Sequence, residues 1–347
     1  MTDPYISLFA GAGGLDLGLA RAGLKPGLVV DADQYACATL RASMPGAPVI
    51  EADVHDVLNS DVLVQDTEGR KPSYSLVAGM PPVVRGKVYG KQDIHPDDDA
   101  PQLLFRFMDA VAQAVPSAFI LFGIPALASR RWSSVLTRIR RMARDLGFDM
   151  FTPVLDASDY GVPQRRDRVA LIGMPKGCKP DISAAPKRLK VSSGAALSSL
   201  PAVRDLSCPA GVRLAPSPVL RDSPYSGQLL NGFGRMLDLR KTAPVISADL
   251  GGNKTPVLDL DQLESGAVPW IERYHDHLWR LGGTPDNLDG GIGRMRRLSL
   301  RECAALQGFP PAHPFCGPSL SQFRQCGAAV PPALAEAVAL AVIAGLA

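Results

Sequence analysis

The sequence has little that would place the protein in a membrane or outside the cell. It contains no run of about 18 uninterrupted apolar residues, the length that a membrane-spanning helix needs. Its first residues, Met1 to Pro4, lack the charged and apolar regions of a secretory signal. We therefore expect a soluble protein of the cytoplasm that has no membrane partner.

Cysteine is also sparse, and the charge is nearly balanced. The six cysteines among 347 residues are scattered, without the paired spacing of metal ligands, so we expect reduced thiols and no metal site. The formal net charge of +3 is too small to indicate a nucleic-acid partner unless basic residues cluster locally. The hydrophobic content of 46% is sufficient for one large core and a smaller one, which predicts two domains.

The N-terminal stretch predicts a strand, a tight turn and a helix. Apolar residues and β-formers run from Tyr5 to Phe9, glycines occupy the turn from Gly11 to Gly14, and apolar residues then recur at helical spacing. Glycines at such a turn let the backbone approach a ligand, and the N–H groups at the start of a helix favour a polar or anionic group. A turn that is only structural remains the alternative.

Acidic residues end the next two predicted strands. Pro26 to Asp31 ends in an acid that could bind both hydroxyls of a ribose, as in doubly wound nucleotide-binding folds. The strand-like run from Val49 to Val54 contains Asp53 at its end. Two acids at successive strand ends predict a pocket at the carboxyl edge of a parallel sheet. Asp53 could instead cap the following helix, or do both.

The rest of the first half alternates between strand and helix patterns, which predicts an α/β fold with a doubly wound sheet. The predicted helices are Gln34–Met44, Gln102–Ala114 and Ser129–Leu146, and the predicted strands are Ser75–Gly79, Ala118–Phe122, Phe148–Val154 and a last apolar strand that ends at Gly173. Gln164, Arg165, Arg166 and Arg168 come at the start of this last strand. Burying these cations is costly without a partner, so we expect carboxylates or phosphates beside them.

Four motifs in order resemble those of the DNA cytosine-C5 methyltransferases. They are Phe9-Ala-Gly-Ala-Gly-Gly-Leu-Asp-Leu-Gly, Gln164-Arg-Arg-Asp-Arg168, Arg297-Leu-Ser-Leu-Arg-Glu-Cys-Ala-Ala-Leu-Gln-Gly-Phe-Pro310 and Gly327-Ala-Ala-Val-Pro-Pro332. The resemblance spans nearly the whole chain and is weakest from about 185 to 290. It implies a Rossmann-like methyltransferase domain at 1–180 and 320–347, and a smaller target-recognition domain that binds DNA at 185–315.

The resemblance also implies ligands and the residues that hold them. The implied cofactor is S-adenosylmethionine or S-adenosylhomocysteine, bound by Phe9, Ala10, Gly11, Gly13, Leu15, Asp31, Asp53, Val54, Pro81, Ala329 and Val330. The implied partner is double-stranded DNA in the nucleoid, contacted by Gln164, Arg165, Arg166 and Arg168. The basic stretch Arg294, Arg296 and Arg297 is a further candidate for phosphate contact, with a solvated surface as the alternative.

Two departures from the family pattern affect the chemistry. The family places a cysteine nucleophile two residues after its first proline, and this chain has Val83 there. C5 of cytosine becomes nucleophilic only after a thiolate adds at C6, and an isopropyl group cannot add. The family glutamate that contacts N3 of the flipped base and assists as an acid is replaced by Phe122, which carries no proton.

The retained residues do not repair these losses. By resemblance, Arg166 approaches a phosphate or the site where the family has its glutamate, and Arg168 approaches the cytosine O2. Because Phe122 replaces that glutamate, one partner of the arginines is missing. Ala328 replaces the usual asparagine of the last motif. Cys303 and Cys326 are interpreted as packed thiols, because free cysteine is usually buried.

Three hypotheses follow. The first is a catalytically deficient relative that binds cofactor and DNA as a non-catalytic subunit or sensor, alone or with an active methyltransferase or another modification or defence protein. The second is an active S-adenosylmethionine-dependent enzyme that uses a route without the usual cysteine. The third is a split system in which a partner chain supplies the nucleophile.

Overall fold

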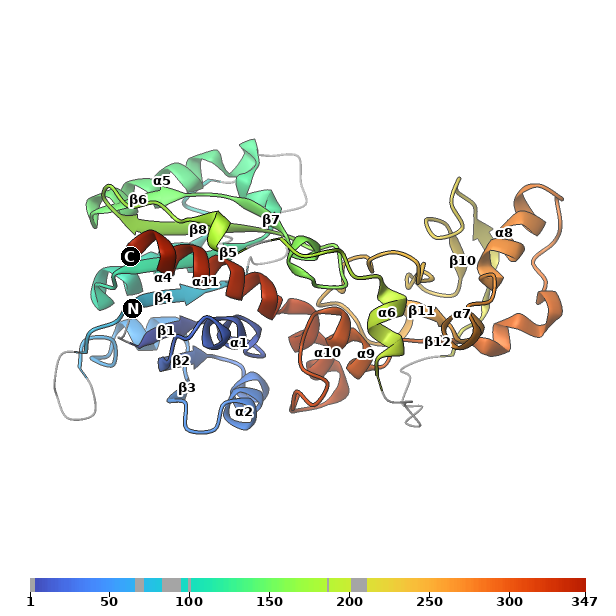
Figure 1. The fold of residues 1–347 in the computed structure, drawn as a ribbon, viewed down its shortest axis with the longest axis horizontal. Helices are drawn as coiled ribbons and strands as arrows, with labels where there is room; N and C mark the ends of the chain where they lie inside the picture. Colours follow the sequence, from blue (N-terminus) through green and yellow to red (C-terminus); the bar gives the residue numbers. More distant parts are fainter. Residues whose placement is uncertain (1–3, 66–71, 83–94, 99–100, 186, 201–210) are drawn as a thin grey trace.

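A computed structural model describes residues 4–65, 72–82, 95–98, 101–185, 187–200 and 211–347. A central eight-stranded sheet forms one part of the molecule, and two small two-stranded sheets lie in the other (Figure 1). The strands of the central sheet are β1 (Tyr5–Leu8), β2 (Pro26–Asp31), β3 (Val49–Glu51), β4 (Leu76–Gly79), β5 (Ala118–Gly123), β6 (Phe148–Phe151), β7 (Val154–Asp156) and β8 (Asp167–Pro175).

The order of the central sheet is β3-β2-β1-β4-β5-β8-β6, with β7 also paired to β8. Strands β1 to β5 are parallel to their neighbours, whereas β8 runs antiparallel to β5. The first residues of β8 therefore lie beside the carboxyl end of β5, at the edge where a doubly wound sheet binds its ligands. The prediction of a doubly wound α/β fold is confirmed.

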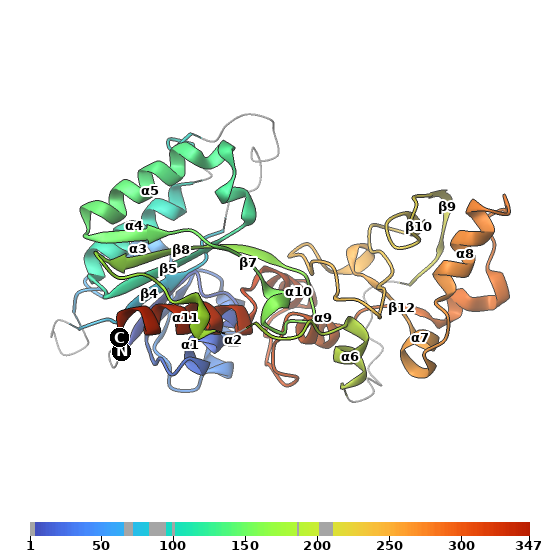
Figure 2. The same ribbon diagram turned by 45° about the horizontal axis from the view of Figure 1, so that its top comes forward.

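Helices cover both faces of this sheet (Figure 2). They are α1 (Gly14–Arg21), α2 (Gln34–Ser43), α3 (Val54–Leu58), α4 (Gln102–Ala114), α5 (Ser133–Asp145) and, from the end of the chain, α11 (Pro332–Leu346). One core layer joins the sheet to α4 and α5, and a second joins it to α1 and α11. Each strand of the sheet centre is buried on both faces, which explains why these strands are almost wholly apolar.

Helix α11, at the end of the chain, packs against α1 and the central sheet. It packs so closely on α1 that a Cβ on Gly18 would lie 2.5 Å from the carbonyl oxygen of Pro332. The stretch Ser319–Leu346 is long and apolar enough to cross a membrane by length and composition alone. Within the fold, however, Leu334, Val338 and Val342 of α11 are buried against the sheet, so its apolar surface is used in the core.

One predicted strand is divided. The sequence pattern from Phe148 to Val154 predicts a single strand, but the structure has β6 and β7, separated at residues 152 and 153. Pro153 has no N–H to donate to a neighbouring strand, so the ladder breaks there. Its carbonyl still accepts a hydrogen bond from Ala170 N at 3.0 Å.

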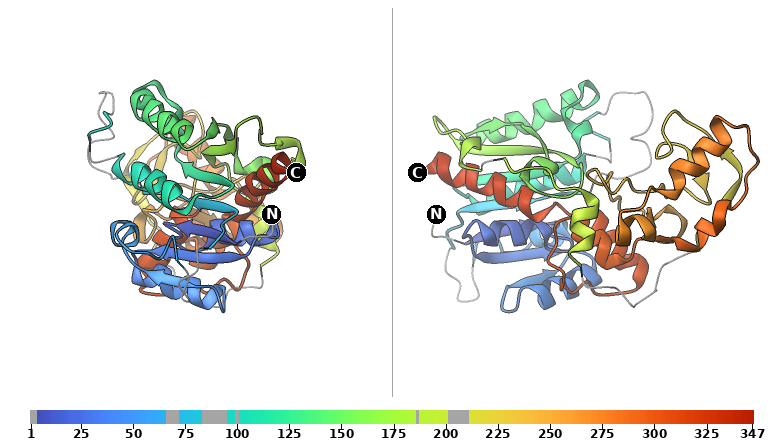
Figure 3. Two further views of the ribbon diagram at one scale, coloured as in Figure 1. Left: turned by 90° about the vertical axis from the view of Figure 1, so that its left-hand side faces the viewer. Right: turned by 45° about the vertical axis from the view of Figure 1, so that its right-hand side comes forward.

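The smaller part of the molecule extends away from the central sheet (Figure 3). It contains β9 (Leu214–Val219) paired with β10 (Gln228–Leu230), and β11 (Val257–Asp259) paired with β12 (Met295–Arg297). Its helices are α6 (Ser193–Ser198), α7 (Leu260–Ser265), α8 (Trp270–Trp279) and α9 (Leu300–Leu306), and α10 (Ser319–Ala328) connects it to α11. The division into domains at 1–180 with 320–347 and at 185–315 stays a prediction.

Candidate functional site

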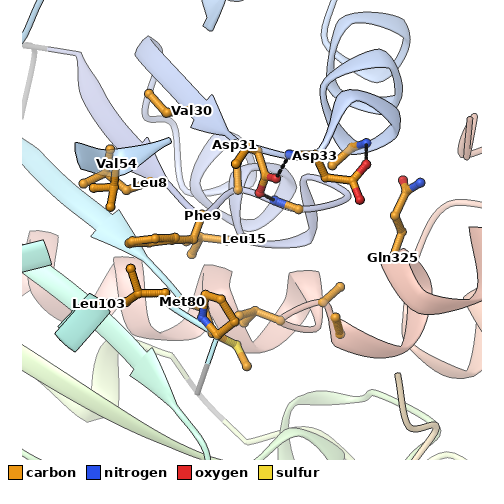
Figure 4. Close-up of a pocket in the computed structure, with 18 of the residues that line it drawn as sticks. Leu8, Phe9, Leu15, Val30, Asp31, Asp33, Val54, Met80, Leu103 and Gln325 are labelled. Atoms are coloured by element: carbon orange, nitrogen blue, oxygen red, sulfur yellow. Dashed lines mark hydrogen bonds between the residues drawn. The ribbon is translucent and has the colours of Figure 1, made fainter. Parts of the chain in front are cut away.

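A pocket of about 360 Å³ opens at the carboxyl ends of β1, β2 and β4 (Figure 4). Met80 and Leu103 lie across it from the acidic side chain of Asp31. Most of its wall is apolar, and a few polar side chains interrupt it. This combination is typical of a small-molecule site, whose volume is commonly about 300–1,000 Å³.

The glycine-rich turn forms one wall of the pocket. Phe9, Gly11 and Gly13 all have positive φ angles, of 56°, 57° and 76°. A bulky residue rarely adopts such an angle, so the surrounding structure must hold Phe9 in place. A Cβ on Gly14 would lie 2.3 Å from the carbonyl oxygen of Val330, which explains the need for glycine at the start of α1.

Asp31 joins the turn to the second strand. One carboxylate oxygen accepts the backbone N–H of Gly11 at 2.8 Å and the other accepts that of Asp33 at 2.8 Å. Burial raises the pKa of this carboxyl group above its usual value. Each oxygen keeps a free lone-pair direction, so binding a ligand hydroxyl is compatible with this structural role.

Asp53 has both of the roles that the sequence allows. It caps α3, accepting the N–H of His55 at 2.8 Å, and it also lines the pocket. The hydrogen bonds from the backbone and ring of His55 lower the pKa of Asp53. The carboxylate is therefore ionised at the rim of the pocket.

Nine of the eleven residues expected at a cofactor line the pocket. They are Phe9, Ala10, Gly11, Leu15, Asp31, Asp53, Val54, Ala329 and Val330. Gly13 and Pro81 are absent from its wall, and Gly13 acts through the geometry of the turn instead. The sequence reasoning missed Arg324 and Gln325, which α10 contributes from the far end of the chain. No local pattern marks these two residues.

Phe122 fills space in the core. Its side chain is fully buried and belongs to the layer that contains Tyr5, Leu15 and Ile120. In the sheet it pairs with Ala170 of β8. An aromatic ring buried in this way offers no hydrogen bond or proton to a ligand. Val83, at the expected nucleophile position, lies outside the described residues.

The arginines at the start of β8 are partnered differently from our expectation. Arg166 is 3% exposed and donates to the carbonyl oxygens of Ile246 and Gly327, each at 2.6 Å. Burial, and then the nearby charge of Arg168, hold the pKa of Arg166 well below its ordinary value. Neutral carbonyls thus hold a side chain for which we expected carboxylates or phosphates.

Gln164 contacts the same segment, around Ile246, that Arg166 contacts. It is fully buried, accepts the N–H of Ile246 at 2.8 Å and donates to Gln307 at 2.9 Å. Arg165 is exposed. Arg168 is 7% exposed and donates to the carbonyl of Asp167 at 3.2 Å, while its Nε has no partner among the described residues. Burial lowers the pKa of Arg168 to about 10.

The basic stretch near β12 is largely neutralised within the fold. Arg294 pairs with Asp261 and Glu264, and Arg296 forms a two-point pair with Glu302 at 2.7 and 2.6 Å. Arg297 is fully buried and donates to the carbonyl of Thr255 at 2.7 Å.

These positions correct one expectation. Gln164, Arg166 and Arg297 are buried in this structure and form hydrogen bonds to groups of the chain itself, so their side chains do not lie on a surface that DNA could reach. Contact with DNA by Arg165, Arg168, Arg294 and Arg296 stays a prediction.

The two cysteines weighed as replacement nucleophiles are packed thiols. Cys303 and Cys326 are both fully buried. Burial raises the pKa of Cys326 to about 12, so its thiolate is scarce at neutral pH. Neither residue lines the pocket. Among the described residues, no group of three or more His, Cys, Asp or Glu side chains is arranged to hold a metal.

The sheet order and the glycine-rich pocket define a methyltransferase-like α/β protein, and comparison with known proteins agrees. The sequence profile of the C-5 cytosine-specific DNA methylases matches residues 4–209 and 272–344. The chain belongs to this family.

Two curated relatives show how far the similarity extends. The type II methyltransferase M1.HphI of Haemophilus parahaemolyticus is 31% identical over 345 residues, which cover 99% of this chain and 87% of the relative. The type II methyltransferase M.PspPI of a Psychrobacter species is 30% identical over 352 residues, with 97% and 78% covered.

Solved structures share the fold at lower identity. A putative DNA modification methyltransferase encoded within an E. coli prophage has a TM-score of 0.70 at 22% identity, with 99% of both chains covered. The Dnmt2 methyltransferase of S. pombe has a TM-score of 0.67 at 13% identity, covering 97% of this chain and 96% of its own.

Proposed function

We propose that this protein binds S-adenosylmethionine or S-adenosylhomocysteine and double-stranded DNA, but does not methylate cytosine C5 by the covalent route. It acts as a non-catalytic subunit or sensor in a DNA modification or defence system. One contrast supports the proposal. The pocket retains its acidic and glycine-rich walls, whereas position 122, where the family has its glutamate, carries the buried apolar ring of Phe122.

The chemistry of the pocket residues fits the cofactor. Asp31 presents a carboxylate suited to ribose hydroxyls, and Asp53 presents another at the rim. Gly11 brings the backbone of the turn to the pocket wall, and apolar side chains such as Leu15 and Val54 suit a purine ring. When bound, S-adenosylmethionine would supply an electrophilic methyl group.

The two positions at which the family activates a cytosine carry Val83 and Phe122 in this chain. Residue 83 is a valine in the sequence, so no thiol is available there to add to C6. Phe122 provides no acid, and Cys326 is buried with a raised pKa. An absent nucleophile cannot be offset by cofactor binding alone, because the unactivated ring does not attack the methyl group.

The test combines binding with transfer. Calorimetric titration of the purified chain with S-adenosylmethionine and S-adenosylhomocysteine should show binding of both. Incubation with radiolabelled S-adenosylmethionine and DNA of mixed sequence should then leave the DNA unlabelled. Asp31→Ala serves as the control for specific binding, since it removes the carboxylate from the pocket. Labelled 5-methylcytosine produced by the chain alone would refute the proposal.

The second candidate is an active S-adenosylmethionine-dependent enzyme with another route, favoured by the intact pocket. It predicts conversion of S-adenosylmethionine to S-adenosylhomocysteine when nucleic acid is supplied. A split system predicts transfer only after a partner chain from the native host has been added. Co-purification from that host, followed by the same assay, separates the split system from a solitary binder.

A further inference from the structure

A rigid loop of the small domain presents an exposed aromatic side chain. Phe233 is 74% exposed, just after β10. A single exposed apolar residue needs no explanation on a mobile loop. Here, however, hydrogen bonds and close contacts fix the backbone on both sides of Phe233.

Two glycines allow this loop to press against a neighbouring segment. The N–H groups of Phe233 and Gly234 both donate to the carbonyl oxygen of Asn253, at 3.0 Å. A Cβ on Gly232 would lie 2.3 Å from that same oxygen, and one on Gly234 would lie 1.9 Å from the carbonyl oxygen of Thr255. No other residue fits at either position without moving the backbone.

The buried Arg297 ties the loop to its support. Its guanidinium donates to the carbonyl of Thr255 at 2.7 Å and to the carbonyl of Asn231 at 2.8 Å. Asn231 also pairs with Arg213, through two hydrogen bonds of 2.9 Å. These bonds join three segments of the chain at Asn231, two residues before Phe233. The backbone that carries Phe233 is therefore fixed by contacts within the chain.

Unneutralised cations surround the same loop. Arg213, Arg235 and Lys254 are exposed, and none of them forms an ion pair with an acidic residue in the described parts of the chain. Arg235 is two residues from Phe233, and Lys254 follows the Asn253 that supports it. By contrast, Arg294 and Arg296 have carboxylate partners. A hollow of about 200 Å³ adjoins Phe233 and Arg235.

We propose that Phe233 is the side chain with which the small domain enters duplex DNA, its ring stacking against a base in the groove. Arg213, Arg235 and Lys254 contact the flanking phosphates. Apolar wedges of this kind enter base steps in duplexes, and a preformed loop lowers the ordering cost of doing so. The inference rests on the proposed function, since it requires that the chain bind DNA.

The test compares Phe233→Ala with two other variants. Phe233→Trp retains a flat ring, and Leu281→Ala removes a side chain of the small domain that is 77% exposed, as a matched control. Fluorescence anisotropy measures binding to a short duplex of mixed sequence. Loss of one stacked base should weaken binding by about 5- to 150-fold in Phe233→Ala. Phe233→Trp and Leu281→Ala should bind like the wild type.

A second measurement reports on the wedge itself. In duplexes carrying 2-aminopurine, the wild type should raise the fluorescence on binding, because unstacking relieves quenching, and Phe233→Ala should not. Arg235→Ala should reduce the slope of log affinity against log salt by about one. Arg280→Ala, which removes an exposed arginine that pairs with Asp276, should leave the slope unchanged. Thermal unfolding should be the same for all these variants of exposed side chains.

The outcomes separate the two proposals. If the wild type binds no duplex, the proposed function fails and this inference fails with it. If the wild type binds and Phe233→Ala binds equally well, only the role of Phe233 is overturned.

Discussion

Nη2 of Arg166 donates to the main-chain carbonyl of Gly327 at 2.6 Å, and so connects the start of β8 to the end of α10. The residues are 161 positions apart in the chain. The same guanidinium also reaches Ile246, in the segment that follows β10. Arg166 therefore holds together the central sheet, the small domain and the last motif.

Replacing Arg166 should destabilise the fold. Arg166→Ala leaves the carbonyl of Ile246 without its donor and the carbonyl of Gly327 with only the long bond of 3.5 Å from Gln307 Nε2. The cost should be roughly 1–3 kcal/mol for each buried group. Arg166→Lys should recover only part of this loss, because one ammonium group cannot reproduce the fork. Urea unfolding measures the effect. Arg165→Ala, at an exposed neighbour, should change stability by no more than about 0.5 kcal/mol. Equal stability of the two alanine variants would show that Arg166 is not a structural tie.

The next prediction concerns position 122, where Phe122 replaces the family glutamate, and its neighbour Arg168. Phe122 pairs with Ala170 on the antiparallel β8, so Arg168 is its diagonal neighbour on the same face of the sheet. A glutamate at position 122 would lie within reach of the guanidinium, whose Nε has no partner among the described residues. We expect Phe122→Glu to be less destabilising when Arg168 is present than in an Arg168→Met background.

A double-mutant cycle of these two changes measures the interaction. The coupling free energy should favour the pair by about 1–3 kcal/mol. Phe122→Gln, which is similar in size and uncharged, is the control and should show weaker coupling. A coupling near zero would mean that the two side chains do not meet.

Asp16 predicts a dependence of stability on pH. This carboxyl group is buried in α1 and shares a hydrogen bond of 3.2 Å with Tyr5, and burial raises its pKa from 3.8 to about 6. Since the folded state binds the proton more tightly, the stabilisation is complete below pH 3.8 and is lost as pH rises through 6. The difference between the folded and unfolded pKa corresponds to a loss of roughly 3 kcal/mol.

Unfolding free energies measured between pH 4 and pH 7 test this directly. In Asp16→Asn the decline over that window should become shallower, because the replaced group does not titrate. Asp61→Asn alters an exposed carboxylate and should keep the slope of the wild type. If Asp16→Asn and the wild type decline in parallel, Asp16 is not the titrating group.

Asp31 should control cofactor affinity through the geometry of the turn. Asp31→Asn leaves one acceptor oxygen where the wild type has two, so either Gly11 or Asp33 loses its bond. A hydrogen bond to a charged group contributes about 1.5–3 kcal/mol, which corresponds to a loss of about 10- to 150-fold in affinity for S-adenosylhomocysteine. Calorimetric titration measures it.

Asp33→Asn is the matched control for this change. Asp33 caps α2 by accepting the N–H groups of Tyr35 and Ala36, and asparagine caps a helix about as well as aspartate. Asp33 also lines the pocket, so Asp33→Asn removes a charge there and leaves the hydrogen bond between Asp31 and the Gly11 turn in place. Similar losses in both variants would point to charge, and not to the turn, as the source of affinity.

The family, the order of strands and helices and most residues around the pocket could be predicted from the amino-acid sequence. Hydrophobic period, glycine position and strand-end acids are local properties, so Gly11, Asp31 and Asp53 could be assigned from them. The residue types at positions 83 and 122 are likewise read directly from the chain.

The partners of the buried polar groups became known only from the folded chain. Contacts made across the whole fold give Arg166 its carbonyl partners and Arg296 its partner Glu302. The same kind of contact brings Arg324 and Gln325 to the pocket wall. A guanidinium has the same local sequence signature whether it meets phosphate, carboxylate or backbone. Its partner is set by the packing of distant segments, which brings the start of β8 against Ile246 and Gly327.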